Sequence, residues 1–552
     1  MKHEEATKFV ILAILDGWGL AANGPGNAIA KANLRNIPKF WASYPHTQLS
    51  ASGESVGLPH GEVGNTQVGH LNIGAGRIVY QDLTRINMSI ADGSFFENEV
   101  LVGAIDHAKE NNSDLHLIGL LGAGGVHSSI EHLYALIQLA SRKEFKRLFL
   151  HVFTDGRDSP TAGAATYIRD LQQILNSEGI GQIASVMGRY WAMDRDRRWD
   201  RTQKAYLALT QGIGHKTTNP EQALRTFYDK SVTDEFIEPT IVVAKDNQPI
   251  GVIKENDAVI FFNFRIDRPR QLTKTFVAKD FQKSASIWDF DPYIAKRAGT
   301  HTIEQSEGEN IFKRGDRIKN MYFVMMTLYE HVMLEEGARV AYPPEHVDLS
   351  IGRVISEAGL RQLRVAESEK ERFVTFYLNG QQNVTYPGED RIIIPSPKVP
   401  TYEQKPEMSA RETTEALIEK ITVDSDYSLI VVNYANADMV GHSGNLGATV
   451  KACEVVDECI GKLANFALAR GGTLLVTADH GNAEELINLS TGNVDTEHSA
   501  NPVPFIAISE KLIESGASLQ SGILADISPT ILTLLGVPVA DSMTGRNLLT
   551  YY

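Results

Sequence analysis

The stretch Lys-Phe-Val-Ile-Leu-Ala-Ile-Leu at residues 8–15 runs directly into Asp16. Short apolar runs rich in β-branched residues are typical of buried parallel strands. Because open α/β sheets place their ligand sites beyond the carboxyl ends of such strands, we expect one sheet edge to collect functional side chains. Two further runs end in the same way: Ser-Leu-Ile-Val-Val-Asn-Tyr-Ala-Asn-Ala at 428–437 before Asp438, and Thr-Leu-Leu-Val-Thr-Ala at 473–478 before Asp479 and His480.

Length and charge limit the classes of protein that this chain can represent. Its 552 residues exceed the size of one hydrophobic core, so two large domains are expected. A net charge of -15 disfavours nucleic acid or an anionic membrane as a partner. The apolar run that ends at Asp16 is too short for a signal peptide or a membrane span. We therefore expect a cytoplasmic protein that acts on a small molecule.

The middle of the chain predicts a second α/β domain. Strand-like runs begin near residues 115, 148, 182 and 258 and alternate with helical segments such as 161–177. The Gly-, Pro- and Asn-rich stretch that follows Asp16, through residue 76, predicts loops and turns. Residues 281–320 mix charges, glycine and aromatics without a clean period, which indicates an insertion or elaborated loop. The predicted fold class is α/β with two α/β domains: a discontinuous one at 1–80 and 345–552, and an inserted one at 81–344.

Carboxylates and imidazoles recur after the predicted strands of the discontinuous domain. Any one such pair is more often a helix cap or a surface histidine than a metal site. Their joint occurrence at strand ends favours a two-metal phosphoryl-transfer site, since two ions about 3.5–4 Å apart need this many anionic and imidazole ligands. The candidate ligands are Asp16, Asp438, His442, Asp479, His480 and His498.

Arginines follow the predicted strands of the inserted domain. A guanidinium binds carboxylate and phosphate bidentately, so the cluster suits a small substrate that carries both groups. An arginine on a loop is usually only a solvated charge. Aromatic residues beside the arginines would allow RNA binding, but interspersed aspartates argue against it. The candidates are Arg157, Asp158, Arg189, Arg195, Arg265 and Arg268.

Several motifs, in order along nearly the whole chain, resemble the cofactor-independent (2,3-bisphosphoglycerate-independent) phosphoglycerate mutases. The metal-type motifs alone would indicate only the wider alkaline phosphatase superfamily. The motifs are Asp16-Gly-Trp-Gly, Gly64-Asn-Thr-Gln-Val-Gly-His70-Leu-Asn-Ile-Gly-Ala-Gly, Gly124-Gly-Val-His127-Ser, Asp155-Gly-Arg157-Asp158, Asp438-Met-Val-Gly-His442 and Asp479-His480-Gly-Asn.

The resemblance implies an alkaline-phosphatase-like metal domain and two Mn²⁺ ions, with Co²⁺ or Zn²⁺ as alternatives, and no 2,3-bisphosphoglycerate cofactor. It implies that Lys370 contacts the transferring phosphoryl group and that Thr66 is the nucleophile. By the same resemblance, one ion is held by Asp438, His442 and His498, and the other by Asp16, Asp479, His480 and Thr66.

The chain departs from the family pattern at two places. The family reads Gly-Asn-Ser-Glu-Val-Gly-His where this chain has Thr66 and Gln67. Threonine keeps a hydroxyl that a metal can acidify, but its methyl group stiffens χ1 and predicts a slower enzyme. Gly122-Ala123 stands where the family usually has Ser-Asp, which predicts a looser loop before His127.

The implied reaction is the interconversion of 3-phosphoglycerate and 2-phosphoglycerate through a phospho-enzyme on Thr66. The inserted domain would bind phosphoglycerate through its arginines and close over glycerate, with Asp158 or His127 moving the hydroxyl proton. One alternative is a metal-dependent phosphatase or phosphopentomutase of the same superfamily. Another is a catalytically silent relative that binds phosphoglycerate. We expect a monomer, because no segment resembles an oligomerisation motif.

Overall fold

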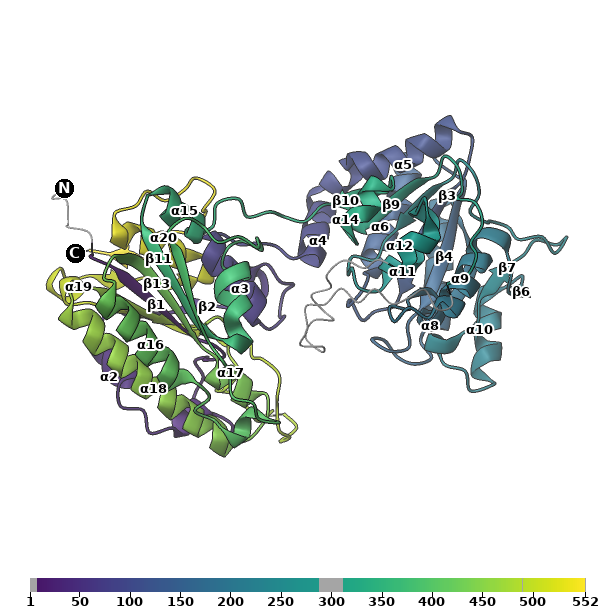
Figure 1. Ribbon diagram of the computed structural model, residues 1–552. Coiled ribbons are helices and arrows are strands. Elements are labelled where there is room, and N and C mark those ends of the chain that lie inside the picture. Colours follow the sequence, from purple (N-terminus) through teal and green to yellow (C-terminus); the bar gives the residue numbers. More distant parts are fainter. Residues whose placement is uncertain (1–6, 287–310, 489, 552) are drawn as a thin grey trace. The chain divides into compact units, whose positions relative to one another are not determined.

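The computed structural model describes residues 7–286, 311–488 and 490–551. The chain divides into two compact units, each an α/β domain (Figure 1). Unit 1 consists of Met1–Gln81 and Glu345–Tyr552, and unit 2 consists of Asp82–Pro344. These limits lie beside the boundaries expected at residues 80 and 345, and the function of each unit is taken up below.

Unit 1 contains an eight-stranded sheet with the order β12-β11-β13-β1-β14-β15-β2-β17. The strands from β12 to β14 are parallel, and β15 pairs antiparallel with both β14 and β2. All six residues of β1 are buried, as expected for a central strand covered on both faces. The bounds are β1 Val10–Leu15, β2 His46–Ser50, β11 Arg361–Glu367, β12 Glu389–Ile394, β13 Tyr427–Tyr434, β14 Thr473–Thr477, β15 Val503–Ile508 and β17 Gly522–Ile523.

Helices cover both faces of this sheet, with α16 and α18 on one face and α15 and α20 on the other (Figure 1). The two cysteines lie buried and unbridged in α18. The bounds are α1 Ala28–Lys31, α2 Ile37–Ser43, α3 Thr66–Ala75, α15 Ile351–Glu357, α16 Ala410–Val423, α17 Asn436–Gly441, α18 Leu446–Ala469, α19 Glu510–Glu514 and α20 Ile527–Leu535.

Helix α3 lies inside the stretch for which loops and turns were expected. Its glycines obscure a helical pattern in the sequence, but packing requires them. A Cβ atom added to Gly69 would lie 2.5 Å from the carbonyl oxygen of Asp479, and one added to Gly74 would meet the backbone of Leu378. Glycine therefore lets the helix approach the end of the sheet closely.

Unit 2 contains a second eight-stranded sheet with the order β10-β9-β8-β3-β4-β5-β7-β6. The strands expected near residues 115, 148, 182 and 258 are confirmed as β3, β4, β5 and β8, which are mutually parallel. The bounds are β3 Leu115–Leu121, β4 Leu148–Thr154, β5 Gln182–Gly188, β6 His215–Thr217, β7 Thr240–Val242, β8 Ala258–Phe261, β9 Tyr322–Thr327 and β10 Arg339–Tyr342.

The core of unit 2 has two layers, one on each face of the sheet. Leu117 of β3 packs in the layer that contains α5, α6, α7 and α10, whereas its neighbour Ile118 packs in the layer of α9, α11 and α12. The bounds are α4 Asp82–Asp92, α5 Glu99–Glu110, α6 Ile130–Arg142, α7 Ala164–Glu178, α8 Arg189–Ala192, α9 Trp199–Gln211, α10 Pro220–Tyr228, α11 Pro269–Val277, α12 Phe281–Ser286 and α14 His331–Glu335.

The insertion expected at 281–320 falls mostly at 287–310, outside the described residues. Its described start forms α12, and Phe312 packs against Phe281 and Tyr206 with ring centroids 5.1 and 6.0 Å apart. No helix among the described residues is long and apolar enough to span a membrane.

Replacing Leu12 by Ala tests the central strand of unit 1. Leu12 is 1% exposed and lies between Val431 and Leu475 of the neighbouring strands. We expect the free energy of unfolding of unit 1 to fall by about 2–5 kcal/mol, measured by urea denaturation. Val423→Ala is the control, because Val423 is 84% exposed and its loss should change stability by less than about 0.5 kcal/mol. Equal effects of the two substitutions would contradict this prediction.

Candidate functional site

The carboxyl ends of four adjacent parallel strands in unit 1 bring together four charged side chains. The order β11-β13-β1-β14 places Lys370, Asp438, Asp16 and Asp479 in sequence along one sheet edge. All four side chains are at most 3% exposed. Lys370 Nζ lies 2.7 Å from Asp16 Oδ1 and 2.6 Å from Asp438 Oδ2. The sheet order therefore produces a buried, acidic centre.

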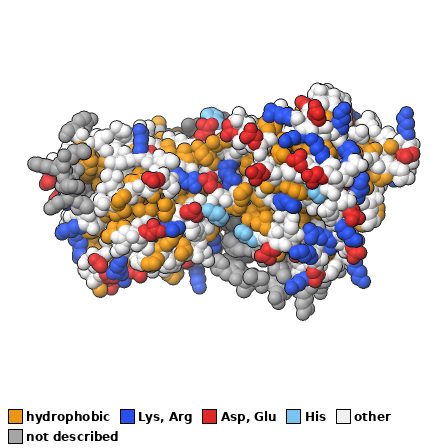
Figure 2. Space-filling view, turned by 90° about the horizontal axis from the view of Figure 1, so that it is seen from above, with side chains coloured by type: hydrophobic (Ala, Val, Ile, Leu, Met, Phe, Trp, Pro, Cys, Tyr) orange, Lys and Arg blue, Asp and Glu red, His pale blue; other side chains and the backbone are white. Residues whose placement is uncertain are grey.

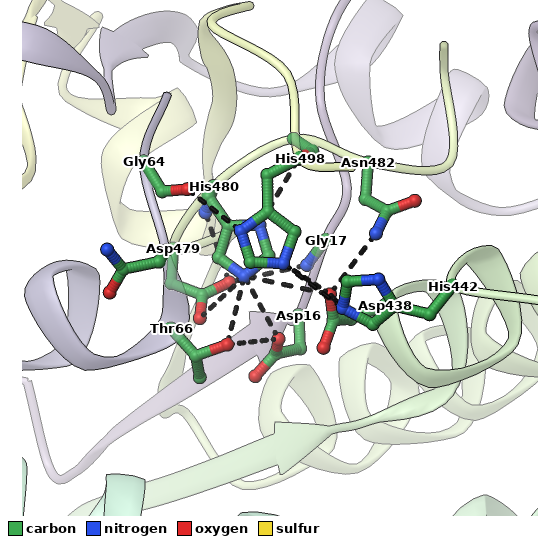
Figure 3. Close-up of polar contacts among 12 residues, drawn as sticks. Asp16, Gly17, Gly64, Thr66, Asp438, His442, Asp479, His480, Asn482 and His498 are labelled. Atoms are coloured by element: carbon green, nitrogen blue, oxygen red, sulfur yellow. Dashed lines mark hydrogen bonds and ion pairs between the residues drawn. The ribbon is translucent and has the colours of Figure 1, made fainter. Parts of the chain in front are cut away.

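His442 and His498 converge with Asp438 on one side of this centre (Figure 3). Each Nε2 atom lies 3.2 Å from Asp438 Oδ1, and the two Nε2 atoms are 3.2 Å apart. Both Nδ1 atoms face backbone carbonyls, those of Thr496 at 2.8 Å and Gly64 at 2.9 Å, and so must carry the ring proton. When both rings are neutral, the Nε2 atoms present lone pairs toward the same carboxylate oxygen, an arrangement that suits a shared cation; without one, Asp438 raises the pKa of His442, so that its ring can carry the positive charge instead.

Thr66 lies at the other side of the centre, at the first position of α3 (Figure 3). Its hydroxyl donates to Asp16 Oδ1 at 3.2 Å and lies 3.0 Å from His480 Nε2. Lys370 Nζ donates to the same hydroxyl at 3.1 Å. Asn65 caps the helix by accepting from the Val68 N–H. The hydroxyl therefore sits at a positive helix end among groups that bind or move protons.

The charges of this centre fit divalent cations. Three buried carboxylates face Lys370 and His480, so the centre keeps an excess of negative charge even when both of these groups are protonated, and this excess is costly without further cations. Burial alone would lower the pKa of His480, but Asp479, Asp16 and Asp438 raise it to about 10. Burial likewise opposes charge on Lys370, yet Asp16 and Asp438 hold its pKa above the ordinary value. Carboxylate oxygens and imidazole nitrogens are the donors that Zn²⁺ and Mn²⁺ accept.

Two polar residues that the sequence analysis left without a role support the carboxylates. His70 Nδ1 lies 3.2 Å from Asp479 Oδ2 and 2.9 Å from the carbonyl of Thr66. Asn433 donates to Asp16 Oδ2 at 2.8 Å and lies 3.1 Å from His70 Nε2. Two features of the sequence indicate these roles. His70 is four residues after Thr66 on one helix, and Asn433 is a polar residue inside an apolar strand.

Unit 2 gathers its candidate residues at the corresponding edge of its own sheet. His127 follows β3, Asp158 follows β4, Arg189 follows β5, and Arg265 and Arg268 follow β8. Because β8-β3-β4-β5 are adjacent and parallel, these residues meet although they are far apart in sequence. A pocket of about 150 Å³ is lined by Arg157, Arg189, Arg195, Arg268, Tyr190 and Glu235, among others.

Carboxylates hold most of these arginines. Arg189, 2% exposed, donates to Asp155 Oδ1 at 2.6 Å and also contacts Asp158. Arg195 contacts Asp267. Arg157 is held less firmly, because its side chain is 57% exposed and its Nη1 atom lies 3.6 Å from Glu235 Oε1. On the face drawn in Figure 2, basic and acidic side chains are interspersed and form no single basic field.

Burial and the surrounding arginines set the protonation of this second cluster. Burial, then the charges of Arg189, Arg265 and Arg268, lower the pKa of His127 to about 2, so its imidazole is neutral at physiological pH. Burial and the charges of Arg189 and Arg195 lower the pKa of Arg268 to about 10. An anion would relieve this repulsion.

The loop at Gly122-Ala123, for which loosening was expected, is tied to the neighbouring turn by Ser159. The Ser159 hydroxyl donates to Asp155 Oδ2 at 2.8 Å and accepts from the Gly124 N–H at 3.1 Å. A Cβ added at Gly122 would lie 2.6 Å from Ser159 Oγ. Ser159, which follows β4, therefore connects this loop to Asp155.

The fold and the two sites define an α/β protein with a carboxylate–imidazole centre suited to divalent cations in one unit and an arginine cluster suited to an anion in the other. Residues 86–331 match the family model described as the BPG-independent PGAM N-terminus. The chain is 48% identical over 540 residues to the 2,3-bisphosphoglycerate-independent phosphoglycerate mutase of Moorella thermoacetica, covering 98% of each chain, and 48% identical over 543 residues to that of Clostridium novyi, covering 98% of this chain and 99% of the relative. The chain therefore belongs to the family of 2,3-bisphosphoglycerate-independent phosphoglycerate mutases.

A solved structure supports the same fold over the whole chain. The crystal structure of Leishmania mexicana phosphoglycerate mutase at low cobalt concentration matches with a TM-score of 0.60 and 27% identity, covering 100% of this chain and 99% of the other.

Removing one imidazole tests the cation centre of unit 1. We expect His498→Ala to lower the affinity for Mn²⁺ by about tenfold or more, since one of three converging donors is lost. Calorimetric titration measures the affinity, and the rise in Tm on adding Mn²⁺ should shrink in parallel. His60→Ala is the control, because the His60 side chain is 94% exposed. Unchanged Mn²⁺ binding by His498→Ala would show that the centre does not use this imidazole.

Proposed function

We propose that this protein interconverts 3-phosphoglycerate and 2-phosphoglycerate through a phospho-enzyme on Thr66, without 2,3-bisphosphoglycerate. Membership of the mutase family supports the substrate. The observation that carries the proposal is the Thr66 hydroxyl, placed at the start of a helix among Asp16, His480 and Lys370. A cytoplasmic location and a monomeric state stay predictions from the sequence.

Two sets of donors in unit 1 would hold two metal ions. Asp438, His442 and His498, which converge in the structure, would bind one ion. The family resemblance assigns Asp16, Asp479 and His480, with the Thr66 hydroxyl, to the other; the side chains that converge there form two overlapping groups, Asp16 with His70 and Asp479, and Asp16 with Asp438 and His480. Bound divalent ions would acidify the hydroxyl and offset charge on the phosphoryl oxygens. Mn²⁺ is our proposal for both, with Co²⁺ or Zn²⁺ able to use the same donors.

Thr66 and Lys370 would carry out the transfer itself. The Thr66 oxygen forms a bond to phosphorus while the bond from phosphorus to the glycerate oxygen breaks, and the return step reverses this at the other hydroxyl. Lys370 already contacts Thr66 Oγ1, so its ammonium group is in place to stabilise charge on the phosphoryl oxygens. The backbone N–H groups at the start of α3 add a positive end to the same position.

Unit 2 would bind the phosphoglycerate. Arg157, Arg189, Arg195, Arg265 and Arg268 offer guanidinium groups for the carboxylate and phosphate. We assign proton transfer to Asp158, whose carboxylate lies 3.8 Å from His127 Nε2, because burial and the nearby arginines lower the pKa of His127 to about 2. His127 would instead hold the substrate hydroxyl as a neutral imidazole. These contacts would also keep glycerate bound until the phosphoryl group returns to it. A mutase needs this retention, because in a phosphatase water hydrolyses the phospho-enzyme instead.

Substitution of Thr66 tests the nucleophile directly. Turnover of 3-phosphoglycerate is measured without 2,3-bisphosphoglycerate, with EDTA and with Mn²⁺ added back. We expect Thr66→Ala to reduce kcat by at least about 10³-fold, since no covalent intermediate can form. Thr66→Ser should stay active and turn over faster than the wild type, because serine lacks the methyl group that restricts χ1.

Four results would contradict the proposal. Full activity of Thr66→Ala would exclude Thr66 as the nucleophile, and full activity in EDTA would exclude the metal role. Release of inorganic phosphate faster than isomerisation would favour the phosphatase alternative. Absence of any turnover, with 3-phosphoglycerate still bound, would favour the silent binding protein.

A further inference from the structure

Asp267 of unit 2 is a buried carboxylate that lies beside three groups proposed above to bind the substrate. Its side chain is fully buried on the segment between β8 and α11. Oδ2 accepts from Arg195 Nη1, and Oδ1 lies 3.2 Å from Arg265 Nε. Oδ1 also lies 3.5 Å from His127 Nδ1.

We propose that Asp267 is a positioning residue for the phosphoglycerate site: it orients Arg195 and Arg265 and holds the ring proton of His127 on Nδ1. This role rests on the proposed function, because it concerns how unit 2 presents its donors to the substrate. Asp267 itself need not touch the substrate.

The environment of His127 supports the assignment of its ring proton. The Nδ1 atom is buried and makes no hydrogen bond within the described residues, and Asp267 Oδ1 is an acceptor at 3.5 Å. The carbonyl of His127 accepts from the N–H groups of Phe264 and Arg265 at 2.9 and 3.2 Å, so the backbone of both segments is joined. An ionised carboxylate only accepts, so Asp267 Oδ1 at 3.5 Å favours the tautomer with Nδ1–H electrostatically, at a distance longer than a hydrogen bond.

The opposite ring nitrogen then faces the place where chemistry is proposed. His127 Nε2 lies 3.8 Å from Asp158 Oδ2, and with the proton on Nδ1 it presents a lone pair. A substrate hydroxyl could donate to Nε2 or to Asp158. The neutral imidazole would thus accept a hydrogen bond from the hydroxyl and direct it beside the proposed base.

Asp267 also restrains two arginines that would otherwise repel each other. It contacts Arg195 through a terminal nitrogen and Arg265 through Nε. A guanidinium has five N–H donors, so each arginine keeps other donors for a substrate. Arg195 comes from the segment after α8, whereas Arg265 follows β8. The Asp267 carboxylate therefore links the segment after α8 to the segment after β8.

Asp267→Asn, with Asp257→Asn as the matched control, tests this role in the full-length, Mn²⁺-loaded protein. Asp257 precedes the same strand, is fully buried and also contacts a histidine, His116 at 3.1 Å, but lies at the opposite strand end. We expect Asp267→Asn to raise the KM for 3-phosphoglycerate about 10- to 100-fold, with Asp267→Glu recovering part of the loss. Asp257→Asn should lower Tm and leave KM unchanged.

The tautomer of His127 is a second readout, and it does not depend on whether the Asp267 variants fold. Nitrogen-15 NMR of histidine-labelled wild-type protein without substrate, assigned with His127→Asn, should show the His127 proton on Nδ1. A proton on Nε2, or an Asp267→Asn variant that loses Tm but keeps KM as the control does, would overturn the proposal. A wild type without mutase turnover would overturn the proposed function instead, and the NMR result would still test Asp267.

Discussion

The structure of unit 1 depends on the need to compensate three carboxylates that its sheet buries side by side. The order β13-β1-β14 sets their placement: an aspartate follows each strand within four residues, Asp438 within helix α17, and parallel neighbours end at the same edge. Such a centre is unfavourable unless cations share it. Lys370, delivered by the next strand β11, supplies one, and the imidazoles provide donors for others. Glycines in α3 then let the Thr66 hydroxyl approach this edge.

Unit 2 differs from unit 1 in the sign of the charge at its sheet edge, because it gathers arginines there instead of carboxylates. Asp155, Asp158 and Asp267 each accept from at least one arginine, so the guanidinium groups are held in place before an anion arrives. Burial, and then residual repulsion from the neighbouring arginines, lowers the pKa values of His127 and Arg268. The site in each unit therefore keeps a surplus of charge of one sign, negative in unit 1, which suits metal ions, and positive in unit 2, which suits a phosphorylated carboxylate.

The departures from the family pattern are local. Thr66 places its hydroxyl among Asp16, His480 and Lys370 and keeps the N-terminal position of the helix, so the methyl group changes the freedom of χ1 and not the set of neighbours. At Gly122-Ala123, the hydroxyl of Ser159 connects the loop to Asp155. The loop at which this chain departs from the family pattern is thus contacted by Ser159. A motif of adjacent residues does not reveal this contact, because Ser159 lies on another segment of the chain.

The sequence by itself determined the strands β1, β13 and β14 of unit 1 and β3, β4, β5 and β8 of unit 2, with the polar residues that follow them, because apolar runs such as 8–15 and the turn residues after them are local signals. It did not reveal helix α3, since the reason for its glycines is the backbone of Asp479, which is distant in the chain. Nor did it reveal the roles of Asn433, His70 and Asp267, whose partners come from other strands. Tertiary structure decided which carboxylate meets which cation, because only the order of strands within each sheet sets those distances.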